Sequence, residues 1–182
     1  MLEKTVFKIT DYIENDLEWE QEECRKLGIH FSHYQLKDAP PREIIEKAGD
    51  ADVVLVNMAK ITAEVIAGFT NVKVILRHGI GYDNVDVEAA TENGIVFANQ
   101  AAASSIDVAE HAIMLMFAAY RKLNVQRQIL EDSFGMEQYD FSEIYPLYRM
   151  EGKTLGIVGC GNIGSIIFKK MKAFGMNMLV VC

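Results

Sequence analysis

Three glycines near residue 160 have the spacing of a phosphate-binding turn. Gly159, Gly161 and Gly164 form the pattern Gly-x-Gly-x-x-Gly, which follows the apolar segment Leu155–Val158 and precedes a helix-like stretch and a second apolar segment, Met178–Val181. In this context the first glycine permits a tight turn, the second lets a pyrophosphate approach the backbone, and the third lets helix and strand pack closely. The pattern therefore predicts a dinucleotide-binding turn, with the phosphates at the amino end of a helix.

The predicted cofactor contacts of this turn are Gly159, Gly161, Asn162, Ile163 and Gly164. A dinucleotide site also needs an acidic residue about 20 residues further on, which binds the adenosine ribose. Residues 165–182 contain neither Asp nor Glu. We therefore expect a site for NAD, with NADP left open, that these residues begin but do not complete, and we expect weak or absent binding of the dinucleotide.

The other residue types that could do chemistry have simpler explanations. Asp107 and His111 are four positions apart and would share a helix face, but a helix start favours acids, which accounts for both Asp107 and Glu110. The three cysteines are odd in number and widely spaced, so they suggest neither a disulfide framework nor a zinc site. We predict no metal site, and free thiols in a reducing cytoplasm.

Composition excludes several classes of partner. The net charge is −8, from 18 basic and 26 acidic residues, which disfavours binding to nucleic acid or to an anionic membrane. No apolar run approaches the ~20 residues of a membrane span. The first residues lack the apolar core of a signal peptide. We expect a cytoplasmic protein whose partner is a small molecule.

Apolar segments and helical patterns alternate over the first hundred residues, which predicts an α/β domain with a parallel sheet. The expected strands are Thr5–Ile9, Ile29–Tyr34, Ala51–Asn57, Val72–Leu76 and Ile95–Ala98. The expected helices are Leu17–Leu27, a helix that Pro40 and Pro41 open and that runs through Lys47, Thr62–Ala67, and Val85–Asn93. The β-branched run in Ala51–Asn57 is typical of a strand that is buried in a parallel sheet.

The pattern changes after residue 103. Ser104–Leu123 predicts a long helix with a wide apolar face that includes Val108, Ile113 and Met116, and we expect this face to be covered by another domain or subunit. Residues 124–150 are less regular, and Phe134–Tyr148 carries aromatic residues without clear periodicity, so we expect an arm or linker there. The exposed apolar face predicts a homodimer or larger assembly, with residues 104–150 in the contact.

Three segments together resemble the D-isomer-specific 2-hydroxyacid dehydrogenases. They are Val74–Asp86, with the sequence Val-Ile-Leu-Arg-His-Gly-Ile-Gly-Tyr-Asp-Asn-Val-Asp, Gly94–Arg121, which contains Val-Ala-Glu-His at 108–111, and Gly152–Gly164. Within the family the chain is most similar to the branch of the C-terminal-binding-protein corepressors and phosphoglycerate dehydrogenases, through Lys60–Ile66 and the loop at 77–86.

The resemblance implies a flavodoxin-like substrate domain over residues 1–99 and the start of a Rossmann nucleotide-binding domain over residues 100–182. It implies that backbone amides of Ile80 and Gly81 hold the carboxylate of a small 2-keto or 2-hydroxy acid, since consecutive N–H groups can bind an anion without crowding. The implied substrate-binding residues are Asn57, Met58, Ala59, Arg77, His78, Gly79, Ile80 and Gly81. Val108 joins the implied cofactor contacts.

The family's catalytic Arg, Glu and His map to none of these 182 residues. Hydride transfer to a keto acid needs a proton donor and a cation at the keto oxygen, so we expect the 182-residue polypeptide to lack dehydrogenase activity. The leading hypothesis is the first part of an NAD(P)-dependent 2-hydroxyacid dehydrogenase. The alternatives are a non-enzymatic, nucleotide-sensing module like the corepressors, and an inactive truncated product.

Overall fold

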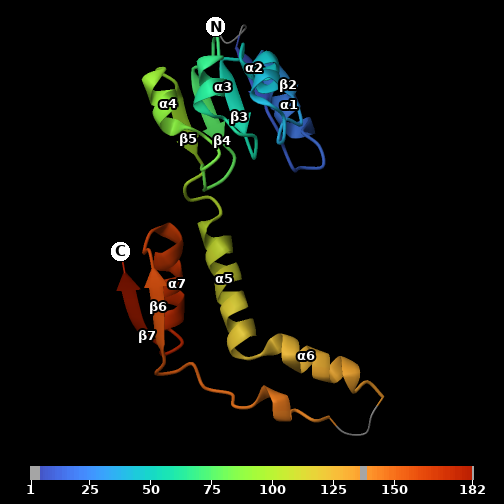
Figure 1. Ribbon diagram of the computed structural model, residues 1–182, viewed down its shortest axis with the longest axis vertical. Helices are drawn as coiled ribbons and strands as arrows, with labels where there is room; N and C mark the ends of the chain where they lie inside the picture. Colours follow the sequence, from blue (N-terminus) through green and yellow to red (C-terminus); the bar gives the residue numbers. More distant parts are fainter. Residues whose placement is uncertain (1–4, 136–138, 182) are drawn as a thin grey trace. The chain divides into compact units, whose positions relative to one another are not determined.

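The chain divides into two compact units, Met1–Ala101 and Ala102–Cys182. The computed structural model describes residues 5–135 and 139–181 (Figure 1). The first unit is an α/β domain and the second is built from helices with one pair of strands. None of the helices in the described ranges is long and apolar enough to cross a membrane. The thiol of Cys182 lies outside the described residues.

The first unit is built on a sheet of five parallel strands in the order β2-β1-β3-β4-β5. The strands are β1 (Val6–Ile9), β2 (His30–His33), β3 (Val53–Val56), β4 (Val74–Arg77) and β5 (Val96–Asn99). This order is that of flavodoxin-like folds, so the predicted fold class is confirmed. The strands of such a fold end at one edge of the sheet, where loops can assemble a site.

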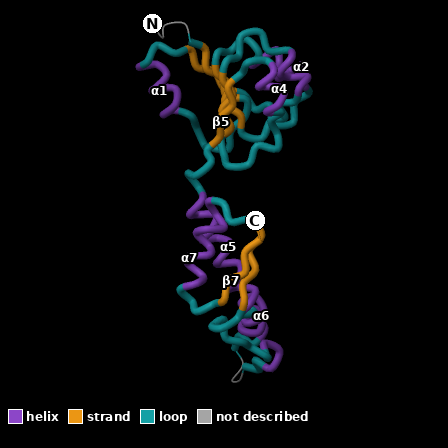
Figure 2. Tube along the Cα trace, turned by 90° about the vertical axis from the view of Figure 1, so that its left-hand side faces the viewer, coloured by secondary structure: helices purple, strands orange, loops and turns teal. Residues whose placement is uncertain are grey.

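Helices cover both faces of this sheet. They are α1 (Glu18–Lys26), α2 (Pro41–Ala48), α3 (Ala63–Ala67) and α4 (Val87–Glu92), and Figure 2 shows α1 on one face with α2 and α4 on the other. Side chains fix two of the helix starts, because Thr62 accepts a hydrogen bond from the Val65 amide and Asp86 accepts one from the Ala89 amide. The cap at Asp86 explains why α4 begins two residues later than predicted.

The core of the first unit lies between the sheet and the α2, α3 and α4 side. Val54 of β3 and Ile75 of β4 are paired in register and fully buried, and Ile44 of α2 and Val65 of α3 belong to the same cluster. Burial of this apolar surface is the main force that holds the parallel strands together.

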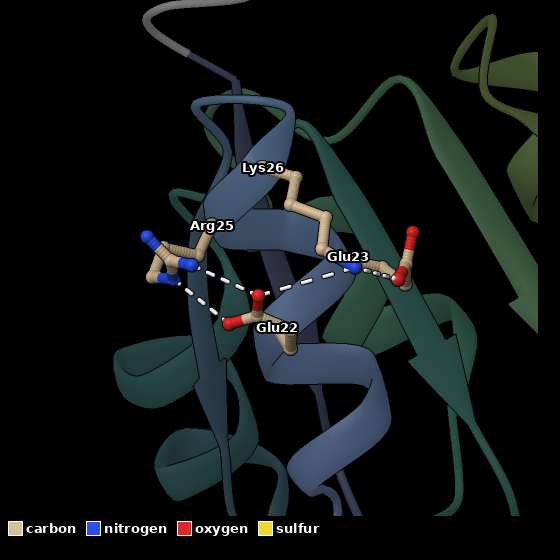
Figure 3. A network of polar contacts seen from close by, with 4 residues as sticks. All are labelled: Glu22, Glu23, Arg25 and Lys26. Carbon is tan, nitrogen blue, oxygen red and sulfur yellow. Dashed lines mark hydrogen bonds and ion pairs between the residues drawn. The ribbon is translucent and has the colours of Figure 1, made fainter.

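The opposite helix, α1, carries a solvated charged face. Arg25 Nε lies 2.8 Å from Glu22 Oε2, and Lys26 Nζ lies 2.7 Å from Glu23 Oε1 (Figure 3). The hydrogen bond from Arg25 lowers the pKa of the Glu22 carboxyl. These exposed pairs contribute little to stability, and they form no site.

The second unit contains α5 (Ser105–Tyr120), α6 (Leu123–Asp132), the 3₁₀ helix η1 (Ser142–Ile144), β6 (Thr154–Val158), α7 (Asn162–Lys172) and β7 (Asn177–Val181). The parallel pair β6 and β7, with the crossover helix α7, is the β-α-β start of the predicted Rossmann fold. Ile113, Met116 and Phe117 of α5 pack with Met171 of α7 in a small core. Glu110 and Lys170 form an ion pair between the same two helices.

The prediction of an irregular arm over residues 124–150 is wrong for its first part, which forms α6. Lys122 adopts the left-handed conformation, with φ of 53°, and separates α6 from α5. No residue of α6 is buried, and its Leu123, Val125 and Leu130 side chains are exposed. Its surface carries two pairs four residues apart, Arg127 with Glu131 and Gln128 with Asp132, which support a solvated helix.

Candidate functional site

The loop that follows β4 begins at the carboxyl edge of the sheet and contains half of the predicted substrate-binding residues, at positions 78–81. The His78 amide donates a hydrogen bond to the Val56 carbonyl at the end of β3, at 2.8 Å. The loops after β3 and β4 therefore start side by side. In open α/β sheets ligands bind at this edge, so the predicted position of the site agrees with the topology.

Arg77, the last residue of β4, folds its side chain over the loop. Its Nη1 donates to the His78 carbonyl oxygen at 2.5 Å, and its Nη2 lies 3.9 Å from the Met58 sulfur. Its Nε is buried and has no hydrogen-bond acceptor in the described part of the chain. The guanidinium is thus held beside the glycine loop as a fixed positive charge.

In the loop at 79–81 two main-chain carbonyls accept hydrogen bonds from the segment at 99–100, which leaves the amides of the loop to be considered. The Gly79 carbonyl accepts from the Gln100 amide at 3.1 Å, and the Ile80 carbonyl accepts from Asn99 Nδ2 at 2.7 Å. Within residues 5–135 and 139–181, the amides of Ile80 and Gly81 donate to no acceptor. Two consecutive unpaired N–H groups next to a guanidinium form an arrangement that can bind a carboxylate.

The amides of the other predicted segment, Asn57–Ala59, already have an acceptor. The carboxylate of Asp11 accepts hydrogen bonds from the amides of Asn57 at 3.3 Å, Met58 at 2.6 Å and Ala59 at 3.1 Å. Asp11 was not predicted from the sequence, although its place two residues after the first strand was a usable signal. A role for this segment in holding a substrate stays a prediction, and its amides are engaged within the protein.

Asn84 connects the two loops. Its Nδ2 donates to the Ala59 carbonyl at 2.8 Å and to the Asn57 carbonyl at 3.3 Å, and its own carbonyl accepts from the Ile61 amide. An open groove of about 610 Å³ lies along this junction; it is lined by Met58, Lys60, Ile61, Thr62, Asp83, Asn84, Val85 and Asp86. Asn84 is a second residue that the sequence analysis missed.

His78 lies at the outer side of the loop. Its Nδ1 is 3.5 Å from Glu14 Oε1, and both side chains are about one-third exposed, at 37% and 34%. This contact becomes an ion pair when the imidazole is protonated. The arrangement links His78 to the loop after β1, so the candidate site draws on the loops after three neighbouring strands.

The glycine turn in the second unit has the geometry that its sequence predicts. Gly159 has φ of +86°, and its amide donates to the Val181 carbonyl at 2.7 Å. A Cβ at Gly164 would lie 2.2 Å from the Gly159 carbonyl oxygen, whereas a Cβ at Gly161 would meet no atom within 4 Å. Asn162 and Ile163 form the first turn of α7.

Val108 is the one predicted cofactor contact that does not belong to the glycine turn at 159–164. It lies on α5, is 42% exposed, and lines an open groove of about 450 Å³ with Asp107, His111, Ala112 and Leu115. None of the three glycines lines that groove. Its assignment to the cofactor stays a prediction.

Comparison with known proteins gives consistent matches along the chain. D-3-phosphoglycerate dehydrogenase of Methanocaldococcus jannaschii is 43% identical over 139 residues, which are 75% of this chain and 25% of that protein. Hydroxypyruvate reductase of Thermotoga maritima is 37% identical over 139 residues, 75% of this chain and 44% of that protein. The crystal structure of D-lactate dehydrogenase from Aquifex aeolicus, complexed with NAD and lactic acid, is 25% identical with a TM-score of 0.81, and the match covers 96% of this chain and 50% of that one.

This chain therefore spans between a quarter and a half of the length of these relatives. The family described as "D-isomer specific 2-hydroxyacid dehydrogenase, catalytic domain" matches residues 9–177. The predicted family and its phosphoglycerate-dehydrogenase-like branch are confirmed, and the chain belongs to the D-isomer-specific 2-hydroxyacid dehydrogenases.

Proposed function

We propose that this chain is the first part of an NAD-dependent dehydrogenase of small D-2-hydroxy acids. The observation that carries the proposal is the pair of amides at Ile80 and Gly81, which have no acceptor among the described residues and lie beside the Arg77 guanidinium at the carboxyl edge of a flavodoxin-like sheet. A carboxylate bound there would be oriented by two hydrogen bonds and one positive charge. The carbon that carries the hydroxyl or keto group would then be fixed next to the loop.

The names of the relatives support the substrate class. Phosphoglycerate, hydroxypyruvate and lactic acid each carry a hydroxyl or keto group on the carbon beside a carboxylate. They differ in the group attached beyond that carbon. The amides of Ile80 and Gly81 would contact only the part that these acids share, so the proposal specifies the class of acid and not one member.

The second unit supplies residues that fit NAD, which is bound in the Aquifex relative. The space in front of Gly161 is open, so a pyrophosphate can approach the backbone there, and α7 directs its positive amino end toward the same place. NAD, when bound, accepts or donates the hydride. The role of this chain is to hold the phosphates at the turn and the acid at the loop.

We also propose a cytoplasmic homo-oligomer. Cys24 and Cys160 are free thiols, which suits a reducing compartment. On α5, the side chains of Val108 and Leu115 are 42% and 54% exposed, whereas Ile113 and Met116 pack against the small core. The exposed pair marks the part of the predicted apolar face that a second subunit would cover.

Calorimetric titration with oxamate, an unreactive analogue of a 2-keto acid, tests the proposed function. Binding rather than turnover is the measurement, because the resemblance maps no proton donor onto these residues. We expect oxamate to bind, and Arg77→Met to weaken its binding about tenfold or more, as expected for a charge-assisted hydrogen bond. Arg42→Met, which changes an exposed arginine on α2, is the matched control. Equal affinity of both variants and the unaltered protein would contradict the proposal, and so would a failure of oxamate to bind. A corepressor-like module would instead show an NAD-dependent protein partner.

A further inference from the structure

Asp11 is a buried carboxylate that acts within the protein as the ligand of an amide cluster. The residue is 2% exposed and follows directly on Ile9 and Thr10 at the end of β1. Its Oδ2 accepts the Met58 amide at 2.6 Å, and its Oδ1 accepts the Ala59 amide at 3.1 Å. The Thr10 hydroxyl donates to the same Oδ1 at 2.8 Å.

Three consecutive N–H groups that converge on one point form a concave site that attracts anions. In this protein the concave site is the start of the loop after β3, at residues 57–59, and the Asp11 carboxylate neutralises it. A buried charge is tolerated because hydrogen bonds replace its hydration. An external carboxylate cannot use these amides while Asp11 holds them.

The neighbouring loop has amides of the same kind without an internal ligand. The amides of Ile80 and Gly81 have no acceptor in the described ranges, although their loop starts beside the loop at 57–59 through the bond from the His78 amide to the Val56 carbonyl. One carboxylate of the protein thus fills one of two adjacent amide clusters and leaves the other for a ligand.

The two loops are also connected mechanically. Asn84, in the loop after β4, donates to the carbonyls of Asn57 and Ala59. The segment at 57–59 is therefore fixed on its amide side by Asp11 and on its carbonyl side by Asn84. Loss of the hydrogen bonds to Asp11 would leave residues 57–59 without a contact on their amide side. Asn84 would then be bonded to a mobile segment, and the loop that contains Ile80 and Gly81 would become less ordered.

We propose that Asp11 is a positioning residue for substrate binding, which occupies the amides of residues 57–59 as an internal anion, orders the loop after β4 through Asn84, and directs the substrate carboxylate to Ile80 and Gly81. The inference rests on the proposed function. Asp11 acts through the loops and not by contact with the acid.

The test compares oxamate binding and amide NMR spectra of the 182-residue chain and three variants. Asp11→Asn removes the charge at nearly constant size, and Asp11→Ala leaves space for formate. Asp16→Asn is the matched control, because Asp16 lies in the same β1–α1 loop but is exposed and accepts a local hydrogen bond from the Glu18 amide. The amide signals of sheet residues report whether each variant is folded.

We expect oxamate to shift the Ile80 and Gly81 signals in the unaltered protein while those of Met58 and Ala59 remain in place. Asp11→Asn should bind oxamate at least about tenfold more weakly, and Asp16→Asn should bind it as the unaltered protein does. Formate, but not chloride at equal ionic strength, should restore the Met58 and Ala59 signals and the oxamate affinity of Asp11→Ala. A loss of affinity that comes from general unfolding of Asp11→Ala, and not from the empty amides at 57–59, would give no formate-dependent recovery of oxamate binding.

The inference is overturned if Asp11→Asn binds oxamate with full affinity, or if formate does not restore Asp11→Ala. If both Asp11 variants fail to fold, the titration of the unaltered protein still tests the inference. A shift of the Met58 and Ala59 amide signals on oxamate addition would contradict an internal anion at these amides. A failure of the proposed function can be distinguished from a failure of the inference about Asp11. Absence of any oxamate shift at Ile80 and Gly81 would reject the proposed function, while formate binding at residues 57–59 of Asp11→Ala would still report on Asp11.

Discussion

Arg77 lies directly over Gly79, so that a Cβ atom at position 79 would be 1.6 Å from the Arg77 Nη1 atom. Gly79 also has φ of +146°, in a region that other residues rarely adopt. The glycine therefore has two functions. It allows the turn after β4, and it leaves the space in which the guanidinium lies beside the loop at 79–81.

Gly79→Ala should disturb both the backbone and the arginine. The strained conformation should lower the free energy of unfolding by about 1–3 kcal/mol, and displacement of Arg77 should weaken oxamate binding. Urea denaturation and calorimetry measure the two effects. Gly156→Ala is the control, since a Cβ there meets no atom within 4 Å. Unchanged stability and unchanged oxamate affinity of Gly79→Ala would show that this close approach has no consequence.

Gly161 and Gly164 should separate cofactor binding from folding. A Cβ at Gly161 meets no protein atom within 4 Å, so Gly161→Ala should fold normally and lose whatever affinity the turn has for NAD or pyrophosphate. A Cβ at Gly164 would lie 2.2 Å from the Gly159 carbonyl oxygen, which is backbone and cannot move aside, so Gly164→Ala should also destabilise the second unit. Thermal unfolding and equilibrium binding of pyrophosphate test this pair. Equal stability of the two variants would contradict the close packing of α7 on the turn.

Asp52 should make the first unit sensitive to acid. The hydrogen bond from Lys73 Nζ, followed by that from the Val6 amide, lowers the pKa of the Asp52 carboxyl. Because the folded-state pKa is depressed, this stabilisation is present above the unfolded value of 3.8 and is lost as the pH falls through the folded-state pKa.

Asp52→Asn should therefore lower the free energy of unfolding at pH 7, and its difference from the unaltered protein should narrow below about pH 4. Lys73→Met removes the largest cause of the shift and should reduce the same pH dependence. Urea denaturation between pH 3 and pH 7 measures both variants. A difference that stays constant over this range would contradict the assignment.

Association should depend on the exposed apolar side chains of α5. Leu115→Glu places a charge on the surface that we propose a second subunit covers, so it should shift the protein toward monomer in sedimentation experiments. Leu27→Glu is the matched control, because Leu27 is 55% exposed and lies in the first unit, outside residues 104–150. A monomer before any substitution, or equal effects of both changes, would reject this contact.

The sequence was sufficient to predict the elements whose signals are local. The β-branched strand within 51–57 and the glycine turn at 159–164 each carry a pattern that depends only on neighbouring residues. Flavodoxin-like strand order followed from the family resemblance and is confirmed by the observed topology.

Longer-range contacts were not predictable in the same way. Asp11 contacts amides 46 to 48 positions away, and Asn84 contacts carbonyls 25 and 27 positions away. The spacing of residues along the chain does not predict such contacts, because it is the parallel sheet that brings the ends of β1, β3 and β4 to one edge. Helix α6 was not predicted either, although Val125 and Ile129 are four residues apart and so share one face of the helix.

Site-resolved NMR of the unaltered chain tests the central claim most directly. ¹⁵N-labelled protein titrated with oxamate should show the largest amide shifts at Ile80 and Gly81, with a dissociation constant that rises in Arg77→Met and not in Arg42→Met. Oxamate binding that leaves both amides unshifted, or that shifts residues outside the loops after β3 and β4, would contradict the proposed carboxylate site.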